Sequence, residues 1–133
     1  MPKKLPTIPA PNQLKLRKSL SIPGLLALVR KEFELIKEHR IKTISYKLTD
    51  VLMGAEAMFG LKYPSLLQFD QSNRDQCTRA NLSNLYGVEQ APSDSQMREI
   101  LDPVAPEDLR PAFRQVHREL QRQKALAKYQ FLG

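Results

Sequence analysis

Residues 81–102, which read NLSNLYGVEQAPSDSQMREILD, contain the clearest helix signals of this chain. Three apolar side chains recur at helical spacing in the first half of this stretch: Leu82, Leu85 and Tyr86. Gly87 is a typical residue for ending such a helix. Ser93 and Gln96 then have the spacing of a capping box, in which a side chain on each residue bonds the other's backbone N–H group. The stretch therefore predicts two short helices joined by a turn.

The second of these helices should bury Met97, Ile100 and Leu101 and end before Pro103. The same periodicity predicts helices over about 22–39 and 45–60, a short helical turn within 63–70, a loop over 70–78, and a last helix from Pro106 or Pro111 to about Tyr129. The expected inward-facing residues are Leu25, Leu28, Val29, Phe33 and Ile36, then Leu48, Val51, Leu52, Ala55 and Phe59, then Phe113, Val116, Leu120 and Leu126. Since no stretch alternates apolar and polar residues over a strand length, we expect an all-α, small and irregular multi-helix fold.

The N-terminal segment has a different composition, with Pro2, Pro6, Pro9 and Pro11 among lysines. Proline at this frequency blocks helix and sheet hydrogen bonding. We therefore expect residues 1–20 to form a basic, disordered arm and residues 21–133 to form one helical domain.

The charge of the chain is uneven along its length. The 133 residues carry a net charge of +7, and residues 1–31 contain seven bases and no acid, whereas residues 49–108 contain ten acids and four bases. Residues 109–133 contain six bases and one acid. A basic balance of this kind favours a polyanionic partner, most often nucleic acid.

Several protein classes are excluded by the same inspection. The longest apolar stretch, residues 22–29, is interrupted by Pro23 and Gly24 and is far shorter than the roughly 20 residues of a membrane span. No apolar region follows the basic N-terminus, so a signal peptide is not expected. Cys77 is the only cysteine, which excludes an internal disulfide and a thiolate zinc site. We expect a cytoplasmic protein with no membrane partner.

The two short helices at 80–102 resemble a helix-turn-helix, whose second helix reads base edges in the major groove. Ser95, Gln96 and Arg98 would then be the reading residues, since arginine suits guanine and glutamine suits adenine. The local charge opposes this interpretation, because Arg98 is the single base of this unit and four acids surround it. Ordinary helix packing is the alternative.

A second candidate DNA contact lies in the last helix, where Arg110, Arg114, Arg118 and Arg122 are each four residues apart. Such a ridge suits a phosphate backbone, because guanidinium groups match phosphate geometry. An ordinary solvated helix face is the alternative. The basic arm is a further candidate, and the DNA-binding residues we expect are Lys3, Lys4, Lys15, Arg17, Lys18, Gln96, Arg98, Arg114, Arg118 and Arg122.

Signals of enzymatic chemistry are poor. Cys77 has no spacing that pairs it with His39 or His117 as a nucleophile and base. Five carboxylates in the middle of the chain are expected to cap helices and solubilise loops and not to bind metal: Asp70, Asp75, Asp94, Glu99 and Asp102. No glycine-rich phosphate loop is present. We therefore expect no cofactor, no metal, no small-molecule substrate and no catalytic activity.

Three segments carry a family resemblance. They are Leu61-Lys62-Tyr63-Pro64-Ser65-Leu66-Leu67-Gln68-Phe69-Asp70, then Asn81 to Asp102 with its Leu85-Tyr86-Gly87-Val88 and Ser93-Asp94-Ser95-Gln96 runs, then Pro106-Glu107-Asp108-Leu109-Arg110-Pro111 with Phe113 and Leu120-Gln121-Arg122. In this order they resemble the N-terminal region of bacterial insertion-sequence transposases of the DDE type. The resemblance covers roughly residues 45–133.

The resemblance implies a helical, DNA-binding region that precedes an RNase H-like catalytic domain. In the family that domain carries the acidic triad and uses magnesium; here the chain ends at Gly133 before any such strand. Two functions stay open. The first is a truncated transposase portion that binds duplex DNA, such as transposon ends, without catalysis. The second is an interaction module or inhibitor that pairs with itself or with a full-length transposase.

Overall fold

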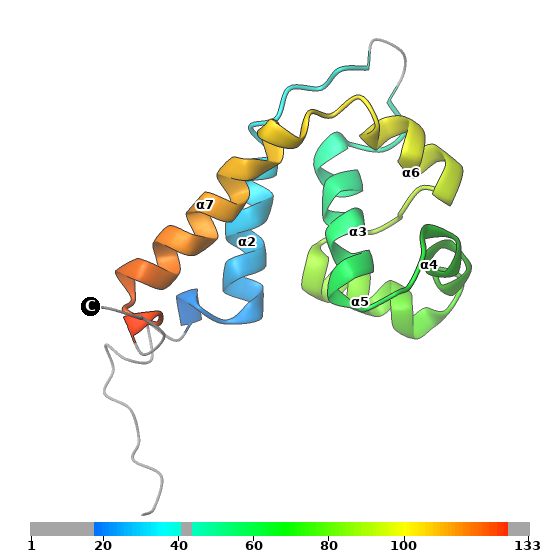
Figure 1. Cartoon of the computed structure of the whole chain (residues 1–133). Coiled ribbons are helices and arrows are strands. Elements are labelled where there is room, and N and C mark those ends of the chain that lie inside the picture. Colours follow the sequence, from blue (N-terminus) through cyan, green and yellow to red (C-terminus); the bar gives the residue numbers. More distant parts are fainter. Residues whose placement is uncertain (1–17, 41–43, 128–133) are drawn as a thin grey trace, which may run out of the picture.

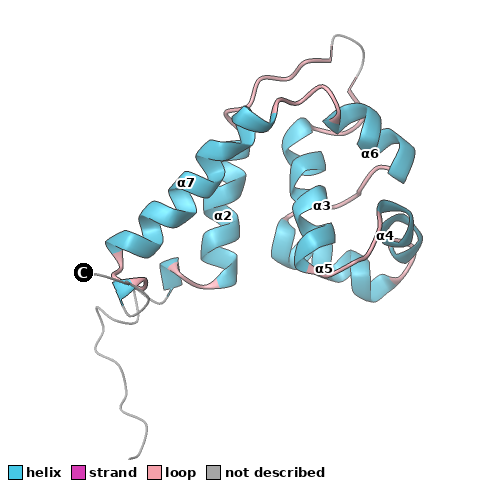
Figure 2. Ribbon diagram, in the orientation of Figure 1, coloured by secondary structure: helices cyan, strands magenta, loops and turns pink. Residues whose placement is uncertain are grey.

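The computed structural model describes residues 18–40 and 44–127, and within these ranges the chain is helical and contains no strand (Figures 1 and 2). The helices are α2 (Ile22–Phe33), α3 (Leu48–Gly60), α4 (Leu66–Ser72), α5 (Gln76–Tyr86), α6 (Asp94–Leu101) and α7 (Pro106–Arg122). The expected all-α fold class is thereby confirmed. The arm residues 1–17 and the last six residues, 128–133, lie outside the described part of the chain.

The helices form two groups (Figure 1). Helices α2 and α7, from opposite ends of the sequence, pack side by side and run antiparallel, while α3, α4, α5 and α6 make a bundle beside them. A hydrogen bond from Gln123 Nε2 to Ser19 Oγ, 3.2 Å long, joins the start of the α2 region to the end of α7. Contacts between residues about a hundred positions apart therefore hold α2 and α7 together.

The hydrophobic core lies around α3. Its most deeply buried side chains come from three helices and one loop: Val51, Met53, Phe69, Val88 and Met97. Phe33 adds the C-terminal end of α2 to this core and Ala112 adds α7. Burial of such apolar side chains is the main free energy that holds short helices of this length together.

Helix ends follow local sequence signals. Ser21, Ser65 and Ser93 are the N-caps of α2, α4 and α6, and each side chain accepts a hydrogen bond from a backbone N–H of the first turn. The capping box of Ser93 and Gln96 forms as predicted. Gly87 ends α5 with a φ of +66°, a left-handed conformation that glycine adopts without steric cost. These boundaries confirm the helix signals of residues 81–102.

Arg30 of α2 connects the two groups of helices. Its Nη2 donates to the carbonyl oxygens of Tyr86 and Gly87, at 3.0 and 2.9 Å, and its Nη1 lies 3.1 Å from Asp50 Oδ1. A cation at the end of α5 complements the negative end of the helix dipole, and Asp50 lies in the first turn of α3. One side chain therefore anchors α2 to both α3 and α5.

The first expected helix is shorter than predicted, because α2 ends at Phe33 and not near residue 39. Residues beyond it leave the helix for tertiary contacts. The ring Nε2 of His39 lies 2.8 Å from the Ile100 carbonyl oxygen, and since a carbonyl can only accept, Nε2 is the donor. Arg40 Nη2 donates to the carbonyl of Tyr46. These bonds hold the chain extended against α6 where the apolar periodicity alone predicted another turn.

Two further boundaries correct the sequence prediction. The predicted loop over 70–78 is mostly helical, because α4 continues to Ser72 and α5 begins at Gln76. The last helix ends at Arg122, where Lys124 adopts a φ of +56° and the Ala125 N–H donates to the Leu120 carbonyl. This is the pattern of a Schellman C-cap, which stops the helix without glycine.

Two of the predicted inward-facing residues lie on the surface. Phe59 of α3 is 70% exposed and Phe113 of α7 is 65% exposed. Both belong to the apolar stripe of their helix, but the residues that α7 buries or half-buries are Ala112, Val116 and Leu120. The prediction that Phe59 and Phe113 are buried is therefore wrong.

Candidate nucleic-acid interface

The four arginines of the predicted ridge, Arg110, Arg114, Arg118 and Arg122, are all exposed on the single helix α7. Each step of four residues turns an α-helix by about 40° beyond a full circle, so the whole ridge turns by about 120° around the axis. Arg114 and Arg118 occupy the middle of this stripe. The helix therefore presents a spiral of guanidinium groups on the side away from its packed face.

Arg122 differs from the other three because it is paired. Its Nη2 lies 2.7 Å from Glu119 Oε1 and its Nε lies 3.1 Å from Oε2. These hydrogen bonds, with a further one from Gln123, lower the pKa of Glu119 to about 2, and Glu119 in turn raises the pKa of Arg122. Among the described residues no ion pair involves Arg110, Arg114 or Arg118, so these three guanidinium groups are the ones free to meet phosphates.

The basic arm enters the described structure beside the end of this ridge. Lys18 is exposed, its carbonyl accepts a hydrogen bond from the Ser21 N–H, and the neighbouring Ser19 contacts Gln123 just beyond α7. Figure 1 shows the start of α2 and the end of α7 at the same end of the helix pair. Lys3, Lys4, Lys15 and Arg17 lie outside the described residues. The chain thus brings the base of the arm and the last turn of α7 together, which the sequence did not indicate.

The other candidate residues, Gln96 and Arg98, lie on α6 in the bundle. Gln96 Oε1 accepts from the Ser93 backbone N–H and from Ser93 Oγ, at 3.3 and 3.2 Å, so this side chain serves the helix cap. The Asp94 N–H at the start of α6 points to Asp70 Oδ2 at 3.4 Å. Since carboxylates already occupy the N-terminus of this helix, a DNA phosphate would be repelled there. Arg98 is exposed.

A helix-turn-helix is not confirmed at α5 and α6. The seven residues 87–93 join the two helices, whereas the motif uses a turn of three or four residues. Helix α6 packs mainly against α3 and α4. The structure therefore separates Gln96 and Arg98 from the arginine ridge, and it gives α6 the contacts of an ordinary packed helix.

The residues considered for other chemistry are dispersed. Cys77 is an exposed free thiol, His39 contacts the Ile100 carbonyl, and His117 is exposed on α7. Within residues 18–40 and 44–127 no three side chains of histidine, cysteine, aspartate or glutamate gather as metal ligands would. In the same ranges no helix has the length and apolar character that crossing a membrane requires.

Comparison with protein-family models, with curated proteins and with solved structures finds no match to this chain. Sequence reasoning missed one surface feature, the exposed pair Phe59 and Phe113, since helical periodicity shows which residues share a face and not whether another element covers that face.

Proposed function

We propose that this chain is a DNA-binding portion of an insertion-sequence transposase that contacts duplex DNA, such as transposon ends, through α7 and the basic arm. The observation that carries the proposal is the exposure of Arg114 and Arg118 on one helix without a carboxylate partner among the described residues. Exposed, unpaired guanidinium groups bind phosphates without first breaking an ion pair. Lys18 adds an exposed base beside the C-terminal end of α7, and residues 1–17 carry four more bases.

The transposase assignment rests on the quoted sequence segments, and the DNA-binding role follows from it and from the charge of α7. The family resemblance places the magnesium-dependent acids in a domain that follows this region. We therefore assign no catalytic step to residues 18–40 and 44–127. The single exposed thiol, Cys77, is compatible with a reducing cytoplasm.

A double variant, Arg114→Gln with Arg118→Gln, tests the proposed contact by fluorescence anisotropy on a labelled duplex. If both residues meet phosphates, the plot of log affinity against log salt becomes shallower by about 2, because each phosphate contact contributes about 0.9 to the slope. The matched control is Lys62→Gln with Arg74→Gln, which removes the same charge from exposed positions in the bundle.

The control variant should leave the slope unchanged. An equal loss of slope in both double variants would mean that net charge alone drives binding, and would contradict a contact through α7.

A second candidate function is pairing with another copy or with a full-length transposase. The exposure of Phe59 and Phe113 favours it, since large apolar side chains that gather on a surface mark interaction sites.

A further inference from the structure

A groove of about 290 Å³ lies between α3 and α7. We call it the α3–α7 groove. Apolar side chains from α2, α3, α7 and the end of α6 line it, among them Phe33, Leu52, Phe59, Leu101, Leu109 and Phe113. Phe33 is buried, whereas Phe59 and Phe113 on opposite walls remain largely in water. The groove is therefore an apolar recess with an exposed aromatic ring on each side.

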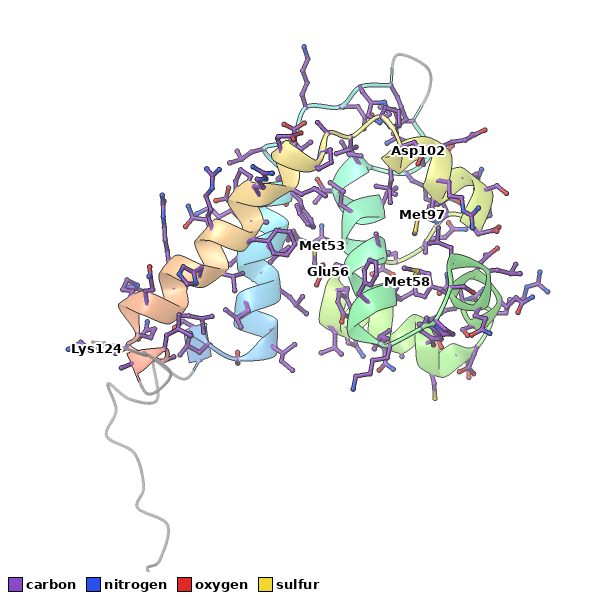
Figure 3. All side chains as sticks on the ribbon, in the orientation of Figure 1. Met53, Glu56, Met58, Met97, Asp102 and Lys124 are labelled. Carbon is purple, nitrogen blue, oxygen red and sulfur yellow. The ribbon has the colours of Figure 1, made fainter. Side chains whose placement is uncertain are left out.

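One acid interrupts this apolar lining. Glu56 of α3 lies on the side of the helix that faces α2 and α7, and it makes no ion pair within the described residues (Figure 3). Its charge contributes to the raised pKa of Tyr86, after the larger effect of burial. A partner that covers the groove must supply a base for Glu56, because burying an unpaired carboxylate is costly.

A base on α7 lies next to the residues that line the groove. Arg110 precedes Phe113 by three residues on α7, which places the two side chains about 60° apart around the helix axis. Arg110 is exposed and has no ion-pair partner among the described residues. The patch therefore combines an aromatic projection, a recess, an unpaired acid and an unpaired base.

A second copy of this chain would match the aromatic rings, the recess, the acid and the base of this surface. In a two-fold symmetric dimer the same patch serves both subunits, so every projection must find its recess and every acid its base on an identical surface. We propose that the α3–α7 groove is the interface of a homodimer, in which Phe113 of each copy enters the groove of the other and Arg110 of one copy faces Glu56 of the other. Arg114 and Arg118 lie about 100° and 140° from Phe113 around the α7 axis, and both line a second recess together with Phe113.

This inference rests on the second candidate function and is independent of DNA binding. Sedimentation equilibrium of the full chain, without DNA, should show a monomer–dimer equilibrium between micromolar and millimolar concentration. Phe113→Ser and Phe59→Ser should each weaken the dimer roughly tenfold or more, the effect of losing an aromatic residue at the centre of an interface. Both side chains are exposed, so neither change removes core packing.

The matched control is Leu67→Ser on α4, which removes an apolar side chain that is 51% exposed and lies outside the groove. It should leave the dimer unchanged. Glu56→Lys and Arg110→Glu should each weaken the dimer, and the two together should restore part of the affinity.

A monomer at every concentration would overturn both the dimer and pairing with itself. A dimer that tolerates Phe113→Ser and Phe59→Ser would retain self-pairing and overturn the assignment to this groove. Neither result bears on the salt dependence of DNA binding.

Discussion

At the scale of single residues, Arg30 is the clearest structural determinant outside the core. It binds two carbonyl oxygens at the end of α5 and the carboxylate of Asp50, and its side chain is 27% exposed. The left-handed turn at Gly87 brings those carbonyls within reach, and a Cβ at Gly87 would press against the guanidinium group. Arg30 is one of the seven bases of residues 1–31. Because these contacts occupy its guanidinium group, Arg30 is not free to bind DNA.

Replacing Arg30 with methionine should destabilise the protein by about 2 kcal/mol, because hydrogen bonds involving a charged group contribute about 1.5–3 kcal/mol. The measurement is urea unfolding followed by circular dichroism, with the free energy of unfolding compared at unchanged m-value. Arg98→Met is the control, since Arg98 is exposed, and it should stay within about 0.5 kcal/mol of the parent. An equal effect of the two substitutions would contradict the anchoring role.

At the scale of secondary-structure elements, local chemistry predicted the starts of α2 and α6 and the end of α5, but not the start of α5 or the ends of α2 and α7. The capping box at Ser93 and the glycine stop at Gly87 need no distant partner, and both could be predicted from a few adjacent residues. Beyond the end of α2, His39 reaches the carbonyl of Ile100, a contact across 61 positions that periodicity does not encode. The Schellman end of α7 uses a lysine in the left-handed conformation, which no sequence signal marks.

The stability of the fold should depend on the ionisation of Glu38, which lies between α2 and α3. Arg40 holds the carboxylate of Glu38 through hydrogen bonds of 2.8 Å and lowers the pKa of Glu38 from its usual 4.5 to about 2. A lowered folded-state pKa stabilises the fold above the unfolded value, and this stabilisation is lost as the pH falls from about 4.5 through 2. Glu38→Gln should therefore lower the thermal midpoint slightly near neutral pH.

That difference should vanish as the pH approaches 2, and scanning calorimetry of both proteins across this range measures it. A difference that stays constant with pH would show that the Glu38–Arg40 pair does not supply it.

At the scale of the whole molecule, the chain separates an acidic bundle from a basic helix pair. Helices α3 to α6 lie in the part of the sequence where acids outnumber bases, and α7 carries the arginine ridge. The antiparallel pairing of α2 with α7 places the base of the arm beside the end of the ridge (Figure 1). Regional charge could be read from the sequence, but this juxtaposition could not, because it arises from packing between opposite ends of the chain.

The candidate site was therefore predictable in its residue types and only partly in its geometry. Spacing by four correctly placed Arg114 and Arg118 on one exposed helix face. It did not show that Glu119 engages Arg122, that Gln96 serves a helix cap, or that Phe113 faces water. Each of these depends on which side chain lies nearest in three dimensions.

The salt dependence of duplex binding measures the proposed contact of DNA with residues 1–18 and α7. If Arg114, Arg118 and the five bases of residues 1–18 all meet phosphates, log affinity should fall against log salt with a slope of about −6, and deletion of residues 1–18 should reduce it to about −2. Absence of binding at low salt, or a slope that the deletion leaves unchanged, would contradict this DNA contact.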